Sequence, residues 1–331
     1  MSSKKKPPVV VVGTIFVDLK CFPKYEINYK GRNPGRVQFY HGGVGRNVAE
    51  TMALLGSDVR FSSSVQEGGL GHEVLGRLHE AGVDVDGVNV TPAPDSHGMW
   101  VAILHRDGDL ACSISQSPNP AHAIEAWERH GKRLLSDARV AVIELDLSER
   151  LADLAIADAR AAGVPIVSVP GNFEAIRRRP DFLSQVHTFV CNQVEAEELW
   201  GQEKAVSSVP AAKEAVRAIL ERGMEQVVVT LGAQGSVAMA RGMTDPIYVP
   251  ALQVDVVDTT GAGDAFVAGL SHALAAGAPL KLAVEAATRV AAWTVGVGES
   301  VCLTIRDRMA ADPWEGWAEL SANTRQAAFE L

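Results

Sequence analysis

The sequence predicts an α/β protein with three layers, in which helices cover both faces of a mainly parallel β-sheet, together with a small β-sheet lid. Three observations predict this class. Short apolar runs typical of strands alternate with helical patterns along most of the chain, as βαβ units require. The first run, residues 9–14, is continuously apolar, as expected for a central strand covered on both faces. Two irregular, strand-like segments, residues 16–40 and 98–115, interrupt the alternation and predict the lid.

Hydrophobic spacing and glycine stops place the individual elements. Residues 44–55 have helical spacing and end at Gly56, and glycine readily adopts the left-handed conformation that closes a helix. Short apolar runs between such segments predict strands. In chain order, we predict a strand over 9–14, a helix over 44–55, a strand over 59–65, a helix over 71–80, a strand over 139–145, a helix over 149–162, strands over 164–169 and 188–191, a helix from 194, a helix over 211–222, strands over 226–230 and 254–257, and helices over 265–275 and 280–295.

The lid prediction depends on its second segment. Residues 98–105 and 110–115 are typical of a hairpin around Asp107-Gly108, because an Asp-Gly pair suits a tight turn. Open α/β sheets bind ligands at the carboxyl ends of their strands, so such a flap is expected to cover a site there. A surface hairpin without a lid role is the alternative.

We predict one main domain with a terminal segment on each side. The alternating pattern, with the lid inserted, fills residues 9–305. Residues 1–8, which hold three lysines before two prolines, are expected to form a mobile tail. Residues 306–331, which contain two tryptophans, are expected to form a helical extension docked on the domain.

Composition and charge exclude several classes of function. The chain has 331 residues, 47% of them apolar and 21% charged, with a net charge of −9. This acidic balance argues against nucleic-acid binding, because a phosphate backbone requires a basic surface. The longest apolar run is about half of the roughly 20 residues that a membrane-spanning helix needs. The four cysteines and nine histidines are scattered, which argues against a disulfide framework or a metal-hydrolase site and favours a reducing cytoplasm.

The segment with the most specific pattern is Asp258-Thr-Thr-Gly-Ala-Gly-Asp264, which precedes an apolar helix. Gly261 and Gly263 allow a tight turn whose N–H groups point to one place, together with the positive end of the helix dipole. Such a turn suits a phosphate, and Asp264 beside it can accept a proton from a hydroxyl. An aspartate there is more often only a helix cap. The two glycines and the apolar helix favour a site.

A second glycine-rich segment, His-Gly-Gly-Val-Gly-Arg-Asn over residues 41–47, begins a predicted helix. Gly42 and Gly43 leave room for a flat polyol against the backbone, and Asn47 offers a donor and an acceptor to a hydroxyl. Asp18, just past the first strand, is placed to accept hydrogen bonds from two neighbouring hydroxyls. A glycine turn with an ordinary helix cap explains this segment equally well.

Two further strand ends carry polar residues that suit a nucleotide. Thr230, with the glycine turn of Gly232 and Gly235, is placed to hold outer phosphates, although many strand turns look alike. Asn192 and Glu195 stand at a strand-to-helix junction, where they form either a capping box or a site that holds Mg²⁺ through water. The P-loop and dinucleotide-binding glycine patterns are absent, which argues against a P-loop enzyme and a nicotinamide dehydrogenase.

Taken in this order, the motifs resemble the ribokinase-like family of sugar and nucleoside kinases, also called the PfkB carbohydrate kinases, over residues 9–300. The two family signatures match Gly42-Gly43…Asn47 and Asp258-Thr-Thr-Gly-Ala-Gly-Asp264. The sequence Gly-Gly-Val-Gly-Arg-Asn is most similar to the corresponding motif of the pseudouridine-kinase branch. The resemblance implies a ribokinase-like, Rossmann-type core with a β lid, ATP and Mg²⁺ as cofactors, often K⁺, and a homodimer joined through the lids.

The resemblance also implies a role for each matching residue. The roles are a base that deprotonates a primary hydroxyl (Asp264), an anion hole over the γ-phosphate (Gly261, Ala262 and Gly263), sugar binding (Asp18, Gly42, Gly43 and Asn47), ATP and Mg²⁺ binding (Asn192, Glu195, Thr230 and Gly232), and K⁺ binding (Asp258 and Thr260, closed by residues 296–300).

We therefore predict an ATP-dependent phosphotransferase that acts on a primary hydroxyl of a sugar or nucleoside, with pseudouridine as one candidate. The alternative is a sugar-binding or nucleoside-binding sensor that kept the fold and lost catalysis. The retention of Asp264 and both glycines disfavours a sensor, because a sensor needs no proton acceptor there. If the substrate carries a phosphate, Arg32, Arg36 and Arg46 are the candidates to bind it.

Overall fold

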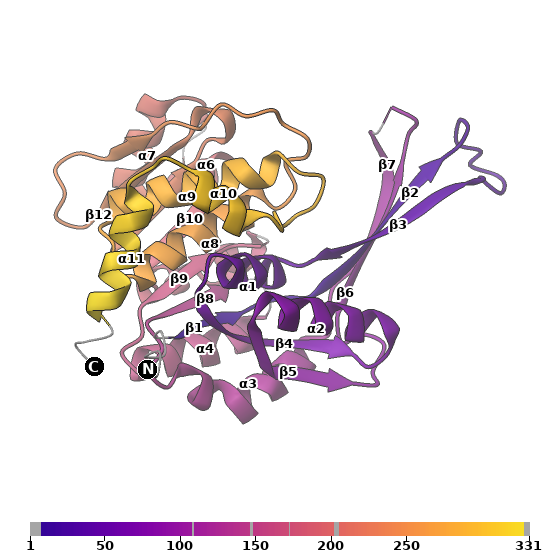
Figure 1. Ribbon diagram of the computed structural model, residues 1–331, viewed down its shortest axis with the longest axis horizontal. Coiled ribbons are helices and arrows are strands. Elements are labelled where there is room, and N and C mark those ends of the chain that lie inside the picture. Colours follow the sequence, from indigo (N-terminus) through magenta and orange to yellow (C-terminus); the bar gives the residue numbers. More distant parts are fainter. Residues whose placement is uncertain (1–7, 108, 146–147, 172, 202–204, 328–331) are drawn as a thin grey trace.

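A large twisted sheet runs through the middle of the molecule, and helices cover both of its faces (Figure 1). The structure, a computed structural model, describes residues 8–327 except 108, 146–147, 172 and 202–204. Within these residues the sheet has nine strands, in the order β13 (Ile247–Val249), β12 (Ser236–Ala240), β11 (Gln226–Thr230), β10 (Thr188–Asn192), β9 (Ile166–Val169), β8 (Val140–Glu144), β1 (Pro8–Val12), β4 (Asp58–Gln66) and β5 (Val83–Thr91). The strands from β11 to β5 pair in parallel, and β12 is antiparallel to both of its neighbours, so the predicted mainly parallel sheet is confirmed.

Two apolar cores lie on opposite faces of this sheet, because successive side chains of a strand point to opposite sides. Val9 and Val11 of β1 belong to one core, with side chains of α1, α2, α8 and α9, and Val10 and Val12 belong to the other, with α3, α4, α6 and α7. The helices are α1 (Val44–Leu54), α2 (Gly69–Ala81), α3 (Pro120–Leu135), α4 (Glu149–Ala161), α5 (Glu174–Arg178), α6 (Gln193–Trp200), α7 (Val209–Leu220), α8 (Ala262–Ala275), α9 (Leu280–Val295), α10 (Ile305–Ala311) and α11 (Gly316–Ala327), with 3₁₀ turns at Pro180–Gln185 and Gly232–Gln234. The three-layer prediction is therefore confirmed.

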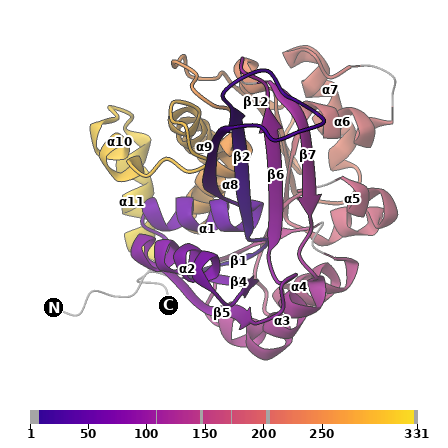
Figure 2. The ribbon, with the colours of Figure 1, turned by 90° about the vertical axis from the view of Figure 1, so that its right-hand side faces the viewer.

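A second, four-stranded sheet projects from the larger body, and the far ends of its strands stand clear of the helices (Figure 1). Figure 2 shows strands of this sheet side by side, in front of the larger body. Its strand order is β3 (Gly35–Gly42), β2 (Phe16–Pro23), β6 (Gly98–Leu104) and β7 (Leu110–Gln116). The pairs β2–β3 and β6–β7 are antiparallel, whereas β2 and β6 are parallel. The small sheet predicted from two separated segments is thus confirmed, and we refer to these four strands as the lid.

The C-terminal segment consists of α10 and α11. Trp317 of α11 stacks on Trp293 of α9 at 5.6 Å between ring centroids, and Trp314 meets Trp317 edge-on at 5.1 Å. Ile305, the first residue of α10, is fully buried, so the predicted boundary after residue 305 falls inside a helix. No helix within the described ranges combines the length and the apolar character needed to cross a bilayer.

Two predicted segments differ from the structure. Pro8, expected in the N-terminal tail, is the first residue of β1, where it pairs with Asp58 and its carbonyl accepts a hydrogen bond from the Arg139 N–H. The rest of that tail lies outside the described residues. The strand predicted over 254–257 is irregular backbone with exposed valines, and the Val257 N–H donates to the Val295 carbonyl instead. An apolar β-branched run forms a strand only where a sheet edge is available to it.

Candidate active site

The glycine turn before α8 is present as predicted. Gly261 has a φ of 79°, and a Cβ at this position would lie 2.1 Å from the Ser300 carbonyl oxygen, so only glycine fits. Gly263, the second residue of α8, faces open space, since a Cβ there would meet nothing within 4 Å. The turn therefore places the start of a helix, with the positive end of its dipole, beside a space that an anion can enter.

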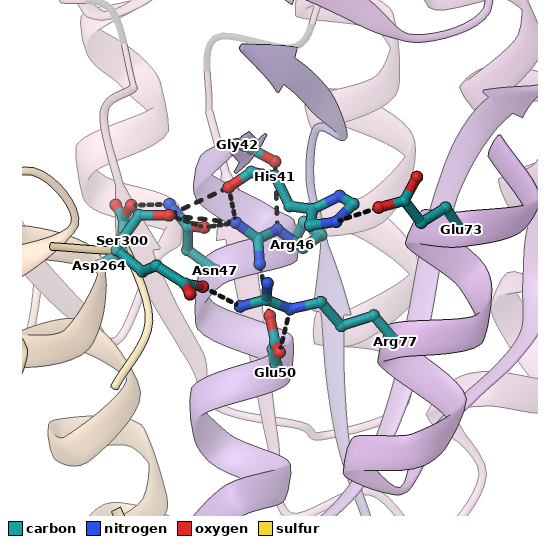
Figure 3. A network of polar contacts seen from close by, with 10 residues as sticks. His41, Gly42, Arg46, Asn47, Glu50, Glu73, Arg77, Asp264 and Ser300 are labelled. Atoms are coloured by element: carbon teal, nitrogen blue, oxygen red, sulfur yellow. Dashed lines mark hydrogen bonds and ion pairs between the residues drawn. The ribbon is translucent and has the colours of Figure 1, made fainter. Parts of the chain in front are cut away.

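Asp264 follows this turn and is tied to the second glycine-rich segment. Its Oδ2 accepts a hydrogen bond from Asn47 Nδ2 at 2.6 Å, although 217 residues separate the two positions (Figure 3). Burial raises the pKa of Asp264 to about 6, against the opposing effects of the Asn47 hydrogen bond and the Arg46 charge. A carboxylate with a pKa near the working pH is suited to accept a proton in catalysis.

Asp18 lies on β2 of the lid, against Gly42 at the end of β3. A Cβ on Gly42 would lie 2.4 Å from Asp18 Oδ2, so the room left by this glycine holds the carboxylate itself. Gly43 has a φ of 97°, and a Cβ there would lie 2.5 Å from the Thr14 carbonyl oxygen. The two glycines therefore let the base of the lid approach β1 closely, which places Asp18 at the site.

Asp18 shares the electrostatic character of Asp264. Burial raises the pKa of Asp18 to about 6, although the positive charges of Arg46 and Lys20 oppose the shift. The pKa values of the predicted sugar-binding carboxylate, Asp18, and of the predicted base, Asp264, are therefore both raised to about 6. Each would accept a hydrogen bond or a proton from a substrate hydroxyl only while ionised.

This pair of carboxylates leads to a pH prediction. Below pH 6, kcat/KM is expected to fall by up to about 100-fold per pH unit, because each group that must be ionised contributes about 10-fold per unit. The measurement is kcat/KM between pH 5 and pH 8 at constant ionic strength. In Asp18→Asn the slope is expected to fall to about 10-fold per unit, with one titrating group left. A rate that stays flat down to pH 5 would show that neither carboxylate acts in the ionised form.

Strand alternation gives the lid an inner face that carries Asp18. The β2–β3 and β2–β6 registers place Tyr40 and Trp100 beside Asp18 on this face, and Lys20 follows two residues later in the same strand. Lys20 Nζ lies 3.4 Å from Asp258 Oδ2 and 4.9 Å from the centroid of the Tyr40 ring. Lys20 was not predicted as a site residue, although its spacing from Asp18 in a strand would have placed it on the same face.

Asp258 and Thr260 form a local turn at the foot of the lid. Asp258 Oδ1 accepts hydrogen bonds from the Thr260 N–H at 2.9 Å and the Thr260 hydroxyl at 2.7 Å. Burial alone would raise the pKa of Asp258, but these bonds and the Lys20 charge outweigh it and lower the pKa. Residues 296–300, which were predicted to close a K⁺ site here, lie next to this turn, because Ser300 packs against Gly261.

The predicted nucleotide residues form a separate group at the carboxyl ends of β10 and β11. Asn192 and Thr230 pair in the sheet register. Asn192 Oδ1 accepts from the Glu195 N–H at 3.0 Å, and Glu195 Oε2 accepts from the Asn192 N–H at 2.8 Å, so the capping-box alternative is formed. Gly235 has a φ of 98° and Gly232 a φ of 55°, which confirms the glycine turn after β11.

Mg²⁺ fits this group only in one mode of binding. Among the described residues, no cluster of three or more His, Cys, Asp or Glu side chains is placed to hold a metal ion. Mg²⁺ that is bound mainly by nucleotide phosphates and water needs only one or two carboxylates from the protein. Glu195 fits that mode, and no all-protein magnesium site is seen in this part of the structure.

Arg46 does not have the role considered for it in substrate-phosphate binding. Its side chain is 1% exposed and donates to the Gly42 carbonyl at 3.2 Å and to Glu50. Arg36, the second of the three candidates, lies over the Phe22 ring of the lid at 4.6 Å. A guanidinium that is already fully engaged in the interior is not available to a substrate phosphate.

Glu144 is a buried residue that sequence reasoning missed. At the carboxyl end of β8, it accepts hydrogen bonds from the Thr14 N–H at 2.7 Å and from the Gly45 N–H at 3.2 Å. It thereby joins the end of β1 to the start of α1, which carries Asn47. The signal was present, because Glu144 is a charged residue near the carboxyl end of a predicted strand whose other residues, apart from Arg139 at its start, are apolar.

Comparison with known proteins decides the family. The model of the pfkB family carbohydrate kinases matches residues 6–303. The chain belongs to this family. As a PfkB kinase, it is 33% identical to the guanosine-inosine kinase of Exiguobacterium acetylicum, over 86% of this chain and 95% of that protein. It is 30% identical to the pseudouridine kinase of Escherichia coli (strain K12), over 85% of this chain and 88% of that protein.

The fold of this PfkB kinase is also that of solved ribokinases. The structure of Arabidopsis thaliana ribokinase complexed with ribose and ATP superposes on this chain with a TM-score of 0.79 at 23% identity. The match covers 95% of this chain and 98% of the ribokinase chain. The predicted ribokinase-like fold and the predicted sugar or nucleoside kinase class are therefore confirmed.

Proposed function

We propose that this PfkB kinase transfers the γ-phosphate of ATP to a primary hydroxyl of a nucleoside. The observation that supports a nucleoside over a free sugar is the inner face of the lid, where Tyr40 and Trp100 flank Asp18 in register. Aromatic rings suit the flat face of a base, and a carboxylate suits neighbouring ribose hydroxyls. The names of the guanosine-inosine and pseudouridine kinases agree with this choice.

The mechanism follows from the positions of the two carboxylates and the glycine turn. Asp18 accepts hydrogen bonds from the ribose hydroxyls and so orients the sugar. Asp264 accepts the proton of the primary hydroxyl through Oδ1, since Oδ2 already accepts from Asn47. The hydroxyl oxygen bonds to the γ-phosphorus as the bond to the β–γ bridging oxygen breaks, and ADP leaves. The turn of residues 261–263 offsets the charge that moves with the phosphoryl group.

The cations fit the site to different degrees. Mg²⁺ would be held through water by Glu195, and when bound it neutralises charge on the nucleotide phosphates. A K⁺ ion at Asp258 fits less well, because this carboxylate already accepts from Thr260 and pairs with Lys20 at 3.4 Å. No step of the proposed transfer depends on K⁺.

The test is a coupled ADP-release screen with pseudouridine, guanosine, inosine, adenosine, uridine, free ribose and fructose, at matched ATP and Mg²⁺. A nucleoside is expected to exceed free ribose by at least about 100-fold in kcat/KM, because the base adds contacts worth about 3 kcal/mol. Asp264→Asn serves as the control for contaminating kinases. Equal or higher kcat/KM with ribose or fructose would overturn the nucleoside assignment.

We also propose that the outer face of the lid joins two copies of this chain. Alternation places an apolar set on this face, opposite to Asp18: Leu19, Cys21, Val37, Phe39, Val101, Ile103, Cys112 and Ile114. Phe39 is 57% exposed and Ile114 is 76% exposed. A contiguous apolar face of this kind marks an interaction surface, and two identical faces can cover each other.

The dimer proposal gives a prediction on solution mass. Wild-type protein is expected to sediment as a dimer at micromolar concentration, and Phe39→Asp with Ile114→Asp is expected to sediment as a monomer, because two carboxylates per chain would be buried without partners. Analytical ultracentrifugation measures both. Lys30→Asp, at the exposed tip between β2 and β3, is the control and should remain dimeric. A monomeric wild type would contradict the proposal.

We further infer a cytoplasmic location. All four cysteines are free thiols, two of them buried and two on the lid. Exposed unpaired thiols are typical of a reducing compartment. Recovery of the enzyme with the cytosolic fraction of its source cells would support this inference, and recovery outside the cytosol would contradict it.

A further inference from the structure

We propose that Arg46 is a positioning residue for phosphoryl transfer, which holds the Asn47 side chain in the orientation that the base requires. The proposal rests on the proposed role of Asp264 as that base. Arg46 does not reach a substrate. Its effect passes through Asn47, which contacts both Arg46 and Asp264 (Figure 3).

The guanidinium of Arg46 is fully used by groups around the site. Nε donates to the Gly42 carbonyl at 3.2 Å, and Nη2 donates to the His41 carbonyl, to Asn47 Oδ1 and to Ser300 Oγ, the last at 3.2 Å. One planar group thus joins the end of lid strand β3, the first turn of α1 and the loop that packs on Gly261. The rigid fork of an arginine suits such a junction, whereas a lysine offers a single point of charge.

The orientation of the Asn47 amide follows from these donors. Its oxygen accepts from Arg46 and lies 3.2 Å from Ser300 Oγ, so its nitrogen points to Asp264 Oδ2 at 2.6 Å. The reversed amide would place an N–H₂ group against the guanidinium and an oxygen against the carboxylate, which are both repulsive arrangements. The chosen orientation engages Oδ2 of Asp264 and presents Oδ1 to the substrate hydroxyl.

The charge of Arg46 is balanced within the same cluster. Glu50, one turn further along α1, is 1% exposed and pairs with Arg46. Glu50 also accepts from Arg77 Nε of α2 at 2.7 Å, and Arg77 reaches Glu299 at 3.0 Å. Replacing a buried ion pair by apolar residues is often neutral or stabilising, so stability alone does not explain why this pair is present. The pair is explained if it holds Arg46 in place to position Asn47 and the loop at Ser300.

Arg46 and Asn47 both lower the pKa of the proposed base, Asp264. The Asn47 hydrogen bond and the Arg46 charge, both from α1, oppose the effect of burial on the pKa of Asp264. If the amide turns or the guanidinium is lost, the pKa of Asp264 moves further upward. The part of the acid limb of kcat/KM that belongs to Asp264 then moves to higher pH, a change that loss of packing alone would not produce. The Arg46 charge also lowers the pKa of Asp18, so the variant to use is Arg46→Lys, which keeps a positive charge there.

The test compares Arg46→Lys and Ser300→Ala with a matched arginine elsewhere. Arg60 of β4 is half-buried, whereas Arg46 is fully buried, but it likewise donates to backbone carbonyls, those of Leu134 and Ser136, and pairs with a carboxylate, that of Asp137. For Arg46→Lys we expect kcat to fall by about 10- to 100-fold, since about 1 Å of misplacement at a reacting group costs about 100-fold. We also expect an acid limb at higher pH and a KM for ATP within about twofold of wild type. Ser300→Ala should show a smaller change of the same sign, and Arg60→Lys no change in kcat or in the pH profile.

The outcomes test the positioning role of Arg46 separately from the role of Asp264 as the base. If Asp264→Asn is inactive but Arg46→Lys and Ser300→Ala keep the wild-type acid limb, the positioning role is overturned and the base stands. If Asp264→Asn is active, the proposed base is wrong, and the positioning role falls with it. Should Arg46→Lys fail to fold, the acid limb of Ser300→Ala decides, because that variant removes a single hydroxyl.

Discussion

Asp264→Asn is expected to lower kcat by about 100- to 10,000-fold, the range that a general base contributes, and to leave KM for ATP within about twofold. The amide has the size and shape of the carboxyl group but cannot accept the substrate proton. Because Asp264 stands at the start of α8, beside the glycine turn, the variant keeps the turn and loses only the proton acceptor. Steady-state kinetics with the preferred nucleoside measures both constants.

Thermal unfolding of the same variant separates chemistry from structure. Burial raises the pKa of Asp264 to about 6, so above that pH the ionised carboxylate disfavours the folded state, and the neutral amide removes this cost. At pH 7.5 Asp264→Asn should therefore unfold at the same temperature as wild type or higher, and the difference should shrink toward pH 4. Near-native turnover would place the base elsewhere. A lower unfolding temperature at pH 7.5 would assign the lost activity to damaged structure.

The parts of this kinase that sequence could predict are those with local causes. The turn of residues 258–264 was predictable because Gly261 must adopt a positive φ and an apolar helix follows. The central strands were predictable because a doubly covered strand is continuously apolar, as β1 is. The capping box of Asn192 and Glu195 was also predictable, since it depends on residues three positions apart.

The parts that sequence could not settle depend on contacts between distant segments. Asn47 meets Asp264, and Lys20 meets Asp258, across more than two hundred residues. Arg46 was a candidate ligand for a substrate phosphate because it lies near the predicted lid in the sequence, yet packing of α1 buried it against Glu50. Which charged side chain becomes an internal support is decided by the tertiary structure that surrounds it.

Gly263→Ala is expected to give an enzyme that is at least as stable as wild type but turns over about 100- to 1,000-fold more slowly. The second residue of a helix tolerates alanine, which favours the helix by about 0.5–1 kcal/mol over glycine. A Cβ at this position meets nothing within 4 Å in the folded chain. The added methyl group instead enters the space beside the turn, where the proposed mechanism places the migrating phosphoryl group against backbone N–H groups.

Gly261→Ala provides the contrast, because the same methyl group has a different effect two residues earlier. Gly261 has a φ of 79°, and its Cβ would lie 2.1 Å from the Ser300 carbonyl oxygen, so this variant should lose both stability and activity. Chemical denaturation together with kcat therefore distinguishes the two glycines: one is required by the fold and the other by the reaction. Full activity in Gly263→Ala would mean that the phosphoryl group does not pass over this turn, and the anion hole would have to be sought elsewhere at the carboxyl ends of the strands.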